Sequence, residues 1–168
     1  VAGYEVNSNF ADGQAVYWKN GEKIYLPTFS FSAATSIFVM DDSVYVAGID
    51  GEGLVYWKNQ TKVKLTVSGE ARRAGGIFVN GKDVYVCGTI RENSPSTLSR
   101  ACYWKNGTKY TLGESGKLSD ASTMVVAGND VYVTGAQHGP GGFAGYWKNG
   151  VPVNLNTSEY QAFVQSIF

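Results

Sequence analysis

The sequence lacks the features of several large protein classes. No apolar run approaches the ~20 residues that a membrane-spanning helix needs. The 14 basic and 14 acidic residues balance to a formal charge of zero, so the basic footprint of a nucleic-acid-binding protein is missing. There is one histidine and no Cys-x-x-Cys pattern, which leaves a zinc site without support. We therefore predict no nucleic-acid partner, no membrane insertion, no metal and no cofactor.

Methionine is also scarce, and the chain begins with Val1 and shows no signal peptide. We expect a processed product, an excerpt or an engineered chain. By contrast, 21 glycines and 11 tyrosines are present, and this balance favours strands and tight turns over helices.

All four tryptophans lie in one recurring motif, Tyr-Trp-Lys-Asn, which indicates an internal repeat. Their spacings along the chain are 39, 47 and 43 residues, and the residues are Trp18, Trp57, Trp104 and Trp147. A second motif, Val-Tyr-Val-x-Gly, keeps step with the first and contains Tyr45, Tyr85 and Tyr132. Aromatic residues repeated among apolar neighbours favour a role in the core between repeats over a role as sugar-binding platforms.

Each repeat divides into four short segments with the character of strands. Strand A is apolar, strand B holds Val-Tyr-Val and strand C holds Tyr-Trp-Lys, followed in three copies by the hairpin signal Asn-Gly. Strand D alternates between apolar and polar residues, as expected for a sheet edge. The Lys residue of each Trp motif is predicted to solubilise this part of the sheet.

Antiparallel units of four strands that recur about every 40 residues predict an all-β protein, a β-propeller of four four-stranded blades. The C-terminal residues 165–168 resemble strand A, so we expect them to pair with the N-terminal partial blade. The single domain 1–168 then divides into blades at about 1–30 plus 160–168, 31–70, 71–115 and 116–159. A β-sandwich is the alternative, but it requires no 40-residue repeat. The strand order leaves both a monomer and a ring-forming homodimer open.

The Tyr-Trp-Lys-Asn-Gly and Val-Tyr-Val-x-Gly segments resemble the repeats of bacterial extracellular and cell-surface β-propeller proteins. The resemblance covers nearly the whole chain. It implies a binding or scaffold module at an extracellular or cell-surface location, and it carries over no catalytic residue.

The two cysteines fall in strands B and C of one repeat, at Cys87 and Cys102. These strands are expected to be antiparallel neighbours, so we predict that the thiols lie near each other. Free, buried thiols are favoured over a disulfide, because neither position recurs as cysteine.

The connections between strands B and C and between strands D and A vary in length and chemistry, whereas the other turns are short and similar. Function concentrates in variable loops on a repeated scaffold. We therefore take eight residues in or near these loops as candidate ligand-binding residues: Arg72, Arg73, Arg91, Arg100, Asp120, His138, Tyr160 and Phe163.

The first hypothesis for function is a non-enzymatic binding or scaffold module that binds a protein or glycan ligand on this variable-loop face. A lectin-like propeller with one sugar site per blade is an alternative, and so is an engineered or excerpted propeller fragment that has no native activity or assembles into a larger ring. A hydrolase or lyase would need convergent carboxylates, for which Asp120 and Glu70 are the candidates. We predict that the protein is not an enzyme.

Overall fold

The described part of the chain forms four antiparallel β-sheets and contains no helix. The computed structural model describes all residues except 7–12, 29, 93–97, 156–163, 165–166 and 168. The first sheet has three strands, β1 (Ala2–Val6), β2 (Gly13–Lys19) and β3 (Glu22–Tyr25). The second has β4 (Ser32–Met40), β5 (Ser43–Asp50), β6 (Gly53–Lys58) and β7 (Thr61–Lys64).

The third and fourth sheets repeat the plan of the second. The third consists of β8 (Ala71–Asn80), β9 (Asp83–Arg91), β10 (Ser99–Lys105) and β11 (Thr108–Thr111). The fourth consists of β12 (Ser119–Ala127), β13 (Asp130–Gln137), β14 (Phe143–Lys148) and β15 (Val151–Asn154). The all-β class and the repeated strand order are thereby confirmed. Residues 165, 166 and 168 of the expected C-terminal strand lie outside the described residues.

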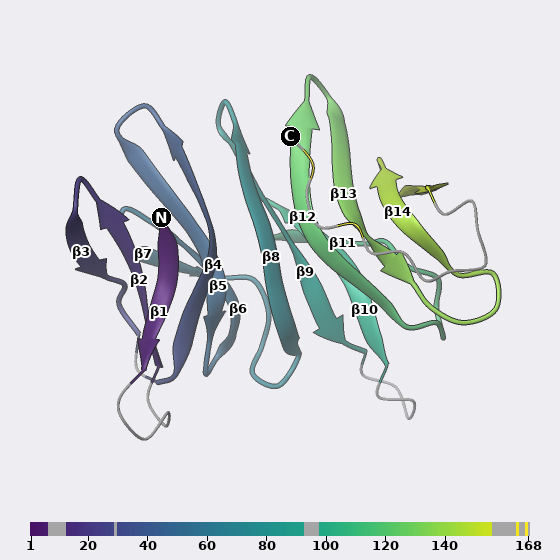
Figure 1. The fold of residues 1–168 in the computed structure, drawn as a ribbon, viewed down its shortest axis with the longest axis horizontal. Coiled ribbons are helices and arrows are strands. Elements are labelled where there is room, and N and C mark those ends of the chain that lie inside the picture. Colours follow the sequence, from purple (N-terminus) through teal and green to yellow (C-terminus); the bar gives the residue numbers. More distant parts are fainter. Residues whose placement is uncertain (7–12, 29, 93–97, 156–163, 165–166, 168) are drawn as a thin grey trace.

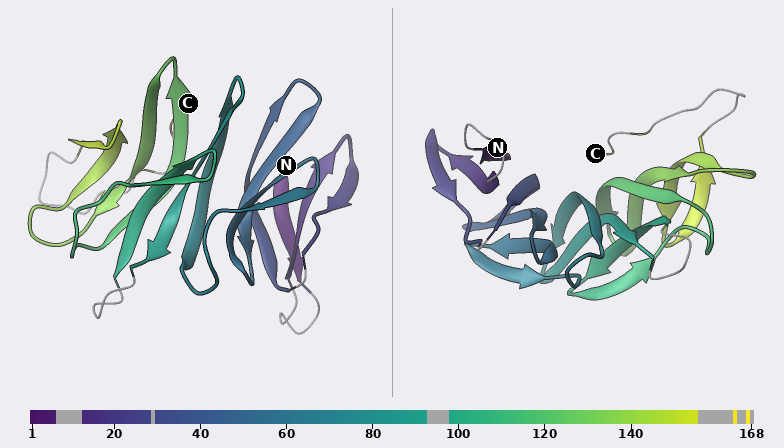
Figure 2. Two further views of the ribbon diagram at one scale, coloured as in Figure 1. Left: turned by 180° about the vertical axis from the view of Figure 1, so that it is seen from behind. Right: turned by 90° about the horizontal axis from the view of Figure 1, so that it is seen from below.

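Neighbouring sheets in the chain are neighbours in space. Strand β4 packs against β1 and β2, β8 packs against β4 and β5, and β12 packs against β8 and β9. The sheets lie side by side along an arc, with the first and fourth sheets at its two ends (Figures 1 and 2). This arrangement is propeller-like.

Tryptophan from strand C links each sheet to the one before it. Trp57, Trp104 and Trp147 are at most 1% exposed. Trp57 lies in an apolar cluster with Tyr17 of the first sheet, and its Nε1 donates a hydrogen bond of 3.0 Å to the carbonyl oxygen of Pro27. Each buried indole removes a large apolar surface from water, at about 25 cal/mol per Å². The predicted role of these three residues in the core is confirmed.

Glycine in the second motif allows strand A, the innermost strand of each four-stranded sheet, to lie close to strand B. A Cβ atom at Gly48 would lie 2.2 Å from the carbonyl oxygen of Ala33, and one at Gly135 would lie 2.0 Å from that of Asp120. The inner strands carry a bulge nearby, since the register shifts between Ala34 and Ser36 in β4. Only glycine fits beneath this bulge, which explains why the motif ends in that residue.

The turn after each Trp motif is fastened to the start of strand B by an asparagine. Asn106 has a φ of 50°. Its Oδ1 accepts a hydrogen bond of 2.9 Å from the backbone N–H of Val84, and its Nδ2 donates one of 2.7 Å to Asp83. Lys105 pairs with the same carboxylate at 2.8 Å and lies 5.3 Å from the ring centroid of Tyr85. We call this arrangement the turn clamp.

The turn clamp recurs in the fourth sheet, and it recurs in part in the second, where Ser43 replaces the aspartate and accepts a hydrogen bond of 3.4 Å from Nδ2 of Asn59. Asn59 and Asn149 each accept a hydrogen bond of 2.8 Å from the first valine of strand B. Lys148 also pairs with Asp130 at 2.8 Å. The repeated lysines of these sheets are therefore held over tyrosine rings within their own sheet, in addition to being partly exposed.

Asn106→Ala should lower the free energy of unfolding by about 2 kcal/mol, because it removes two hydrogen bonds and leaves alanine in the left-handed region. Asn20→Ala is the matched control. Asn20 has a φ of 52°, but no hydrogen bond of its side chain to a described residue is present. Asn20→Ala should lower the free energy of unfolding by about 1 kcal/mol or less, because only the backbone preference at this position changes. Urea unfolding followed by tryptophan fluorescence measures both, and equal losses would contradict the clamp.

The two cysteines lie on neighbouring strands, but their thiols face opposite sides of the sheet. Cys87 is directly opposite Tyr103, and Cys102 is directly opposite Gly88, so the two thiols occupy successive pairs of β9 and β10. Successive pairs face opposite sides of a sheet. Cys87 lies in the cluster between the third and fourth sheets and Cys102 in the cluster between the second and third. The predicted proximity is wrong, whereas the prediction of free, buried thiols is confirmed.

Both thiols should react slowly in the folded protein. Burial raises the pKa of Cys87 to about 12 and that of Cys102 to about 11, and only the thiolate is nucleophilic. Because both values exceed the ordinary 9.0, the unfolded state loses protons first, and stability should fall as the pH rises past about 9. Labelling with a thiol reagent at pH 8 should accelerate only in denaturant. Rapid labelling of the native protein would contradict this.

Candidate functional site: the loop rim

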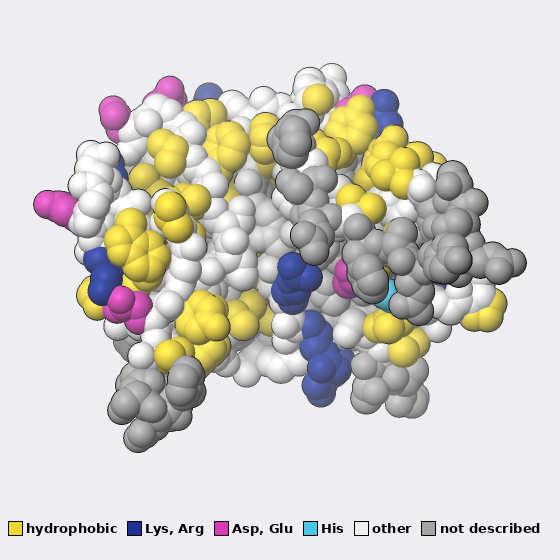
Figure 3. Space-filling model, in the orientation of Figure 1, with side chains coloured by type: hydrophobic (Ala, Val, Ile, Leu, Met, Phe, Trp, Pro, Cys, Tyr) yellow, Lys and Arg dark blue, Asp and Glu magenta, His cyan; other side chains and the backbone are white. Residues whose placement is uncertain are grey.

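The candidate residues lie at the end of the sheets where the inner strands begin. We call this end, with the starts of β4, β8 and β12 and the ends of β5, β9 and β13, the loop rim. Six of the eight candidates lie there, on the third and fourth sheets; Tyr160 and Phe163 lie outside the described residues. The six are Arg72, Arg73, Arg91, Arg100, Asp120 and His138. Basic side chains gather over the lower end of β8 in Figure 3, at its N-terminal end.

Three exposed arginines form what we call the basic patch: Arg72, Arg73 and Arg91. Arg72 and Arg73 follow one another near the start of β8, and Arg91 ends the neighbouring strand β9. The backbone N–H of Arg91 donates a hydrogen bond of 2.6 Å to the carbonyl oxygen of Glu70. None of the three guanidinium groups forms an ion pair within the described ranges, and all three residues are exposed.

Arg100 has a different role from the basic patch. Its side chain is 17% exposed. Nε and Nη2 donate hydrogen bonds of 3.0 and 2.7 Å to the carbonyl oxygen of Gly113, and Nη1 pairs with Glu92. These donors hold β10 to the segment after β11. Arg100 therefore supports the rim instead of presenting a free cation.

Asp120 and His138 form a pair on the fourth sheet. Oδ2 of Asp120 lies 2.8 Å from Nε2 of His138, and both side chains are about two-fifths exposed. The backbone N–H of His138 also donates a hydrogen bond of 2.8 Å to the carbonyl oxygen of Leu118. The pair orients an imidazole at the rim. Glu70, the other carboxylate considered for a hydrolase, comes directly before β8, and its Oε2 accepts a hydrogen bond of 3.4 Å from the backbone N–H of Val67.

A charged cluster on the second sheet was not expected from the sequence. Lys62 lies 2.8 Å from Asp50 and 2.7 Å from Glu52, and Lys64 lies 2.7 Å from Glu52. Hydrogen bonds from Lys62 and then Lys64 lower the pKa of Glu52 to about 2. The sequence signal is the pair of lysines at alternate positions of strand D opposite an acidic turn. Because every charge in the cluster has a partner, it fastens the edge strand.

The variants Lys62→Met and Lys64→Met test the buried and the exposed part of this cluster independently. The carboxylate of Asp50 is 1% exposed, so removing Lys62 leaves a buried charge poorly compensated and should cost about 3 kcal/mol of unfolding free energy. Lys64 is 55% exposed, and its loss should cost less than about 1 kcal/mol. Thermal or urea unfolding compares the two. A larger loss for Lys64→Met would reject this assignment.

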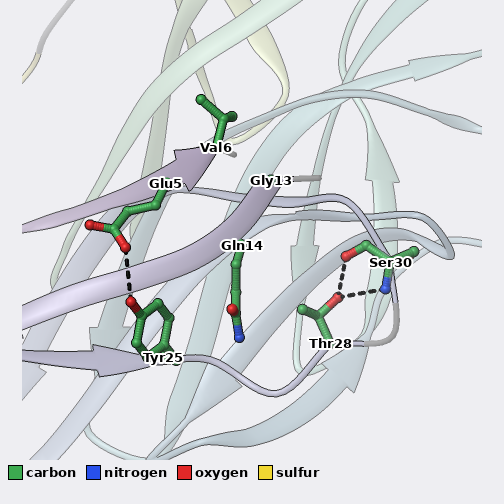
Figure 4. A pocket seen from close by; sticks show the side chains of 7 residues that line it. All are labelled: Glu5, Val6, Gly13, Gln14, Tyr25, Thr28 and Ser30. Carbon is green, nitrogen blue, oxygen red and sulfur yellow. Dashed lines mark hydrogen bonds between the residues drawn. The ribbon is translucent and has the colours of Figure 1, made fainter. Parts of the chain in front are cut away.

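A polar pocket of about 500 Å³ opens on the first sheet (Figure 4). Oε2 of Glu5 accepts a hydrogen bond of 2.9 Å from the Tyr25 hydroxyl. Asp50 occupies the position of Glu5 in the second sheet, where it is 8% exposed and accepts a hydrogen bond of 2.8 Å from Lys62. The pocket thus lies where the carboxylate of the first sheet is more exposed than its counterpart in the second. Its lining is Glu5, Val6, Gly13, Gln14, Tyr25, Thr28 and Ser30.

Comparison with models of known protein families finds no match for this chain, and comparison with curated protein sequences finds none either. Within the described residues, no group of three or more His, Cys, Asp or Glu side chains is placed to hold a metal ion. No helix in that part of the chain is long and apolar enough to cross a membrane.

Proposed function

We propose that the protein is a non-enzymatic β-propeller module that binds an anionic group of its ligand at the basic patch of the loop rim. The observation that carries the proposal is the presence of three exposed arginines on two adjacent strands, none of which has an ion-pair partner among the described residues. Arginine presents a planar fork of donors that matches carboxylate, sulfate or phosphate oxygens. Two other basic residues of the loop rim already have partners. Arg100 pairs with Glu92, and His138 pairs with Asp120.

The contrast between the two ends of the sheets supports a binding role. The end opposite the loop rim repeats the asparagine hydrogen bond of the turn clamp in all three four-stranded sheets. At the loop rim, equivalent positions of the inner strands carry Ala33, Arg73 and Asp120. A scaffold that is uniform at one end and variable at the other is the arrangement in which loops carry function.

The propeller assignment extends the observed arc of four sheets. In this proposal residues 165–168 supply strand A to a first sheet, β1 to β3, and so give it four strands like the others. The match between Ser166-Ile167-Phe168 and Ser36-Ile37-Phe38 supports it. An extracellular or cell-surface location accords with a module that only binds, and it belongs to the same proposal.

An array of neutral, sialylated and sulfated glycans, followed by titration with a sulfated oligosaccharide, tests the binding site. The double variant Arg72→Ser, Arg73→Ser should bind the sulfated probe at least about 10-fold more weakly, the equivalent of 1.4 kcal/mol. The control, Lys19→Ser with Lys82→Ser, removes the same charge from exposed residues at the opposite end and should change binding less than about 2-fold.

Two results would overturn this proposal. One is the absence of binding to every anionic glycan and to an acidic peptide used as a second probe. The other is an equal loss for the arginine and lysine variants, which would show a response to net charge alone. Binding of neutral glycans that is unaffected by the arginine variants would favour the lectin alternative instead.

A further inference from the structure

One face of the first sheet is partly exposed, whereas the equivalent face of each other sheet is buried. Trp57, Trp104 and Trp147 pack against the preceding sheet and are at most 1% exposed. Trp18 holds the same position in β2 but is only partly buried. On the same side of the sheet, Glu5 pairs with Lys23 and bonds to Tyr25. We call this side the tryptophan face.

The fourth sheet has the complementary exposed side. Tyr45 and Tyr85, in strand B of the second and third sheets, are each 5% exposed because the following sheet covers them. Tyr132 holds the same position in β13 and is partly exposed. Its ring lies 6.0 Å from that of Tyr146 and 5.4 Å from Nζ of Lys148. We call this side the tyrosine face.

These two faces are the two halves of one repeated interface. Between the second and third sheets, Tyr45 lies in the same apolar cluster as Trp104. Between the third and fourth sheets, Tyr85 lies in the same cluster as Trp147. The tyrosine face at Tyr132 is therefore matched to the tryptophan face at Trp18 in residue types and strand positions.

The charges beside both faces are already paired, which lowers the cost of bringing the faces together. Glu5 bonds to Lys23 on the tryptophan face, and Asp130 pairs with Lys148 beside the tyrosine face. Burying an ion pair costs less than burying a lone charge, because each partner keeps its counterion.

The two faces lie apart in the described part of the chain. The first and fourth sheets are at opposite ends of the arc (Figure 2), and no strand pairing joins their described residues. Bringing them together would require a change at all three tightly packed interfaces between the sheets. Such interfaces resist continuous deformation, because their side chains are packed at crystal-like density.

We propose that a second copy of this chain covers both faces. The tryptophan face of each copy binds the tyrosine face of the other, and the two arcs form one ring with two-fold symmetry. A head-to-tail interface of this kind leaves no face exposed when the rotation closes. This inference rests on the propeller assignment above, but not on the basic patch or its ligand.

Light scattering of the intact chain tests the stoichiometry. We expect twice the 18.1 kDa mass of one chain, and halving of the mass for Trp18→Glu and for Tyr132→Glu, each of which places a charge in the contact. Val67→Glu is the matched control, because Val67 is 65% exposed and lies outside both faces. It should remain at twice the chain mass. Far-UV circular dichroism checks that each variant keeps its strands.

Mixing the two single variants distinguishes this arrangement from other dimers. The Trp18→Glu chain keeps a native tyrosine face, and the Tyr132→Glu chain keeps a native tryptophan face. An equimolar mixture should therefore recover a complex of one chain of each, through one native contact. A chain with both substitutions should form no complex with itself.

Four outcomes would overturn the proposal. A monomeric native chain at concentrations well above micromolar would show that the faces stay apart or close within one molecule. Growth to larger assemblies would show that the rotation does not close with two copies. Dimers that survive both single substitutions would place the contact elsewhere, as would a failure of the mixed variants to associate. The glycan titration is unaffected by any of these results, so the two proposals fail separately.

Discussion

The contact between a strand-C tryptophan and the preceding sheet is the interaction on which the rest of the structure depends. Each four-stranded sheet inserts one fully buried indole into its neighbour. The ring lies against the glycine of the second motif, as the 3.0 Å approach of the Trp57 ring to a Cβ position at Gly48 shows. The indole therefore fixes both the sheet spacing and the residue allowed beneath it. Core interfaces built this way tolerate little change in volume.

Much of this fold could be predicted because its core residues recur. Trp57 and Gly48 mark strands C and B regardless of the loops between them, so the repeat indicates the strands and their order. The cysteines show where such prediction fails. The sequence predicts the strands of Cys87 and Cys102 as neighbours, and this is correct. Each cysteine, however, lies one residue away from direct opposition to the other, so the two side chains are on opposite faces of the sheet. Sequence spacing across a loop of variable length does not specify that register.

The loop rim was harder to predict than the scaffold. The sequence located Arg73 and Arg100 in variable connections, yet it could not distinguish a free guanidinium from one whose donors are already used. Arg100 bonds to a backbone carbonyl, whereas Arg73 has no ion-pair partner among the described residues. The partners that decide this come from segments distant in sequence. The spread of the sheets into an arc also depends on the angle between packed sheets, which periodicity does not encode.

The turn clamp has a consequence for how this chain folds. All of its contacts join strands B and C of one sheet, and each four-stranded sheet is made of strands consecutive in the chain. The contacts formed first are therefore short in sequence, which favours fast folding for a β protein. Any sheet can begin the process, and its neighbours then add to it, as in other repeat architectures. Gain or loss of one repeat by gene duplication or deletion would leave the nucleus of every remaining sheet intact.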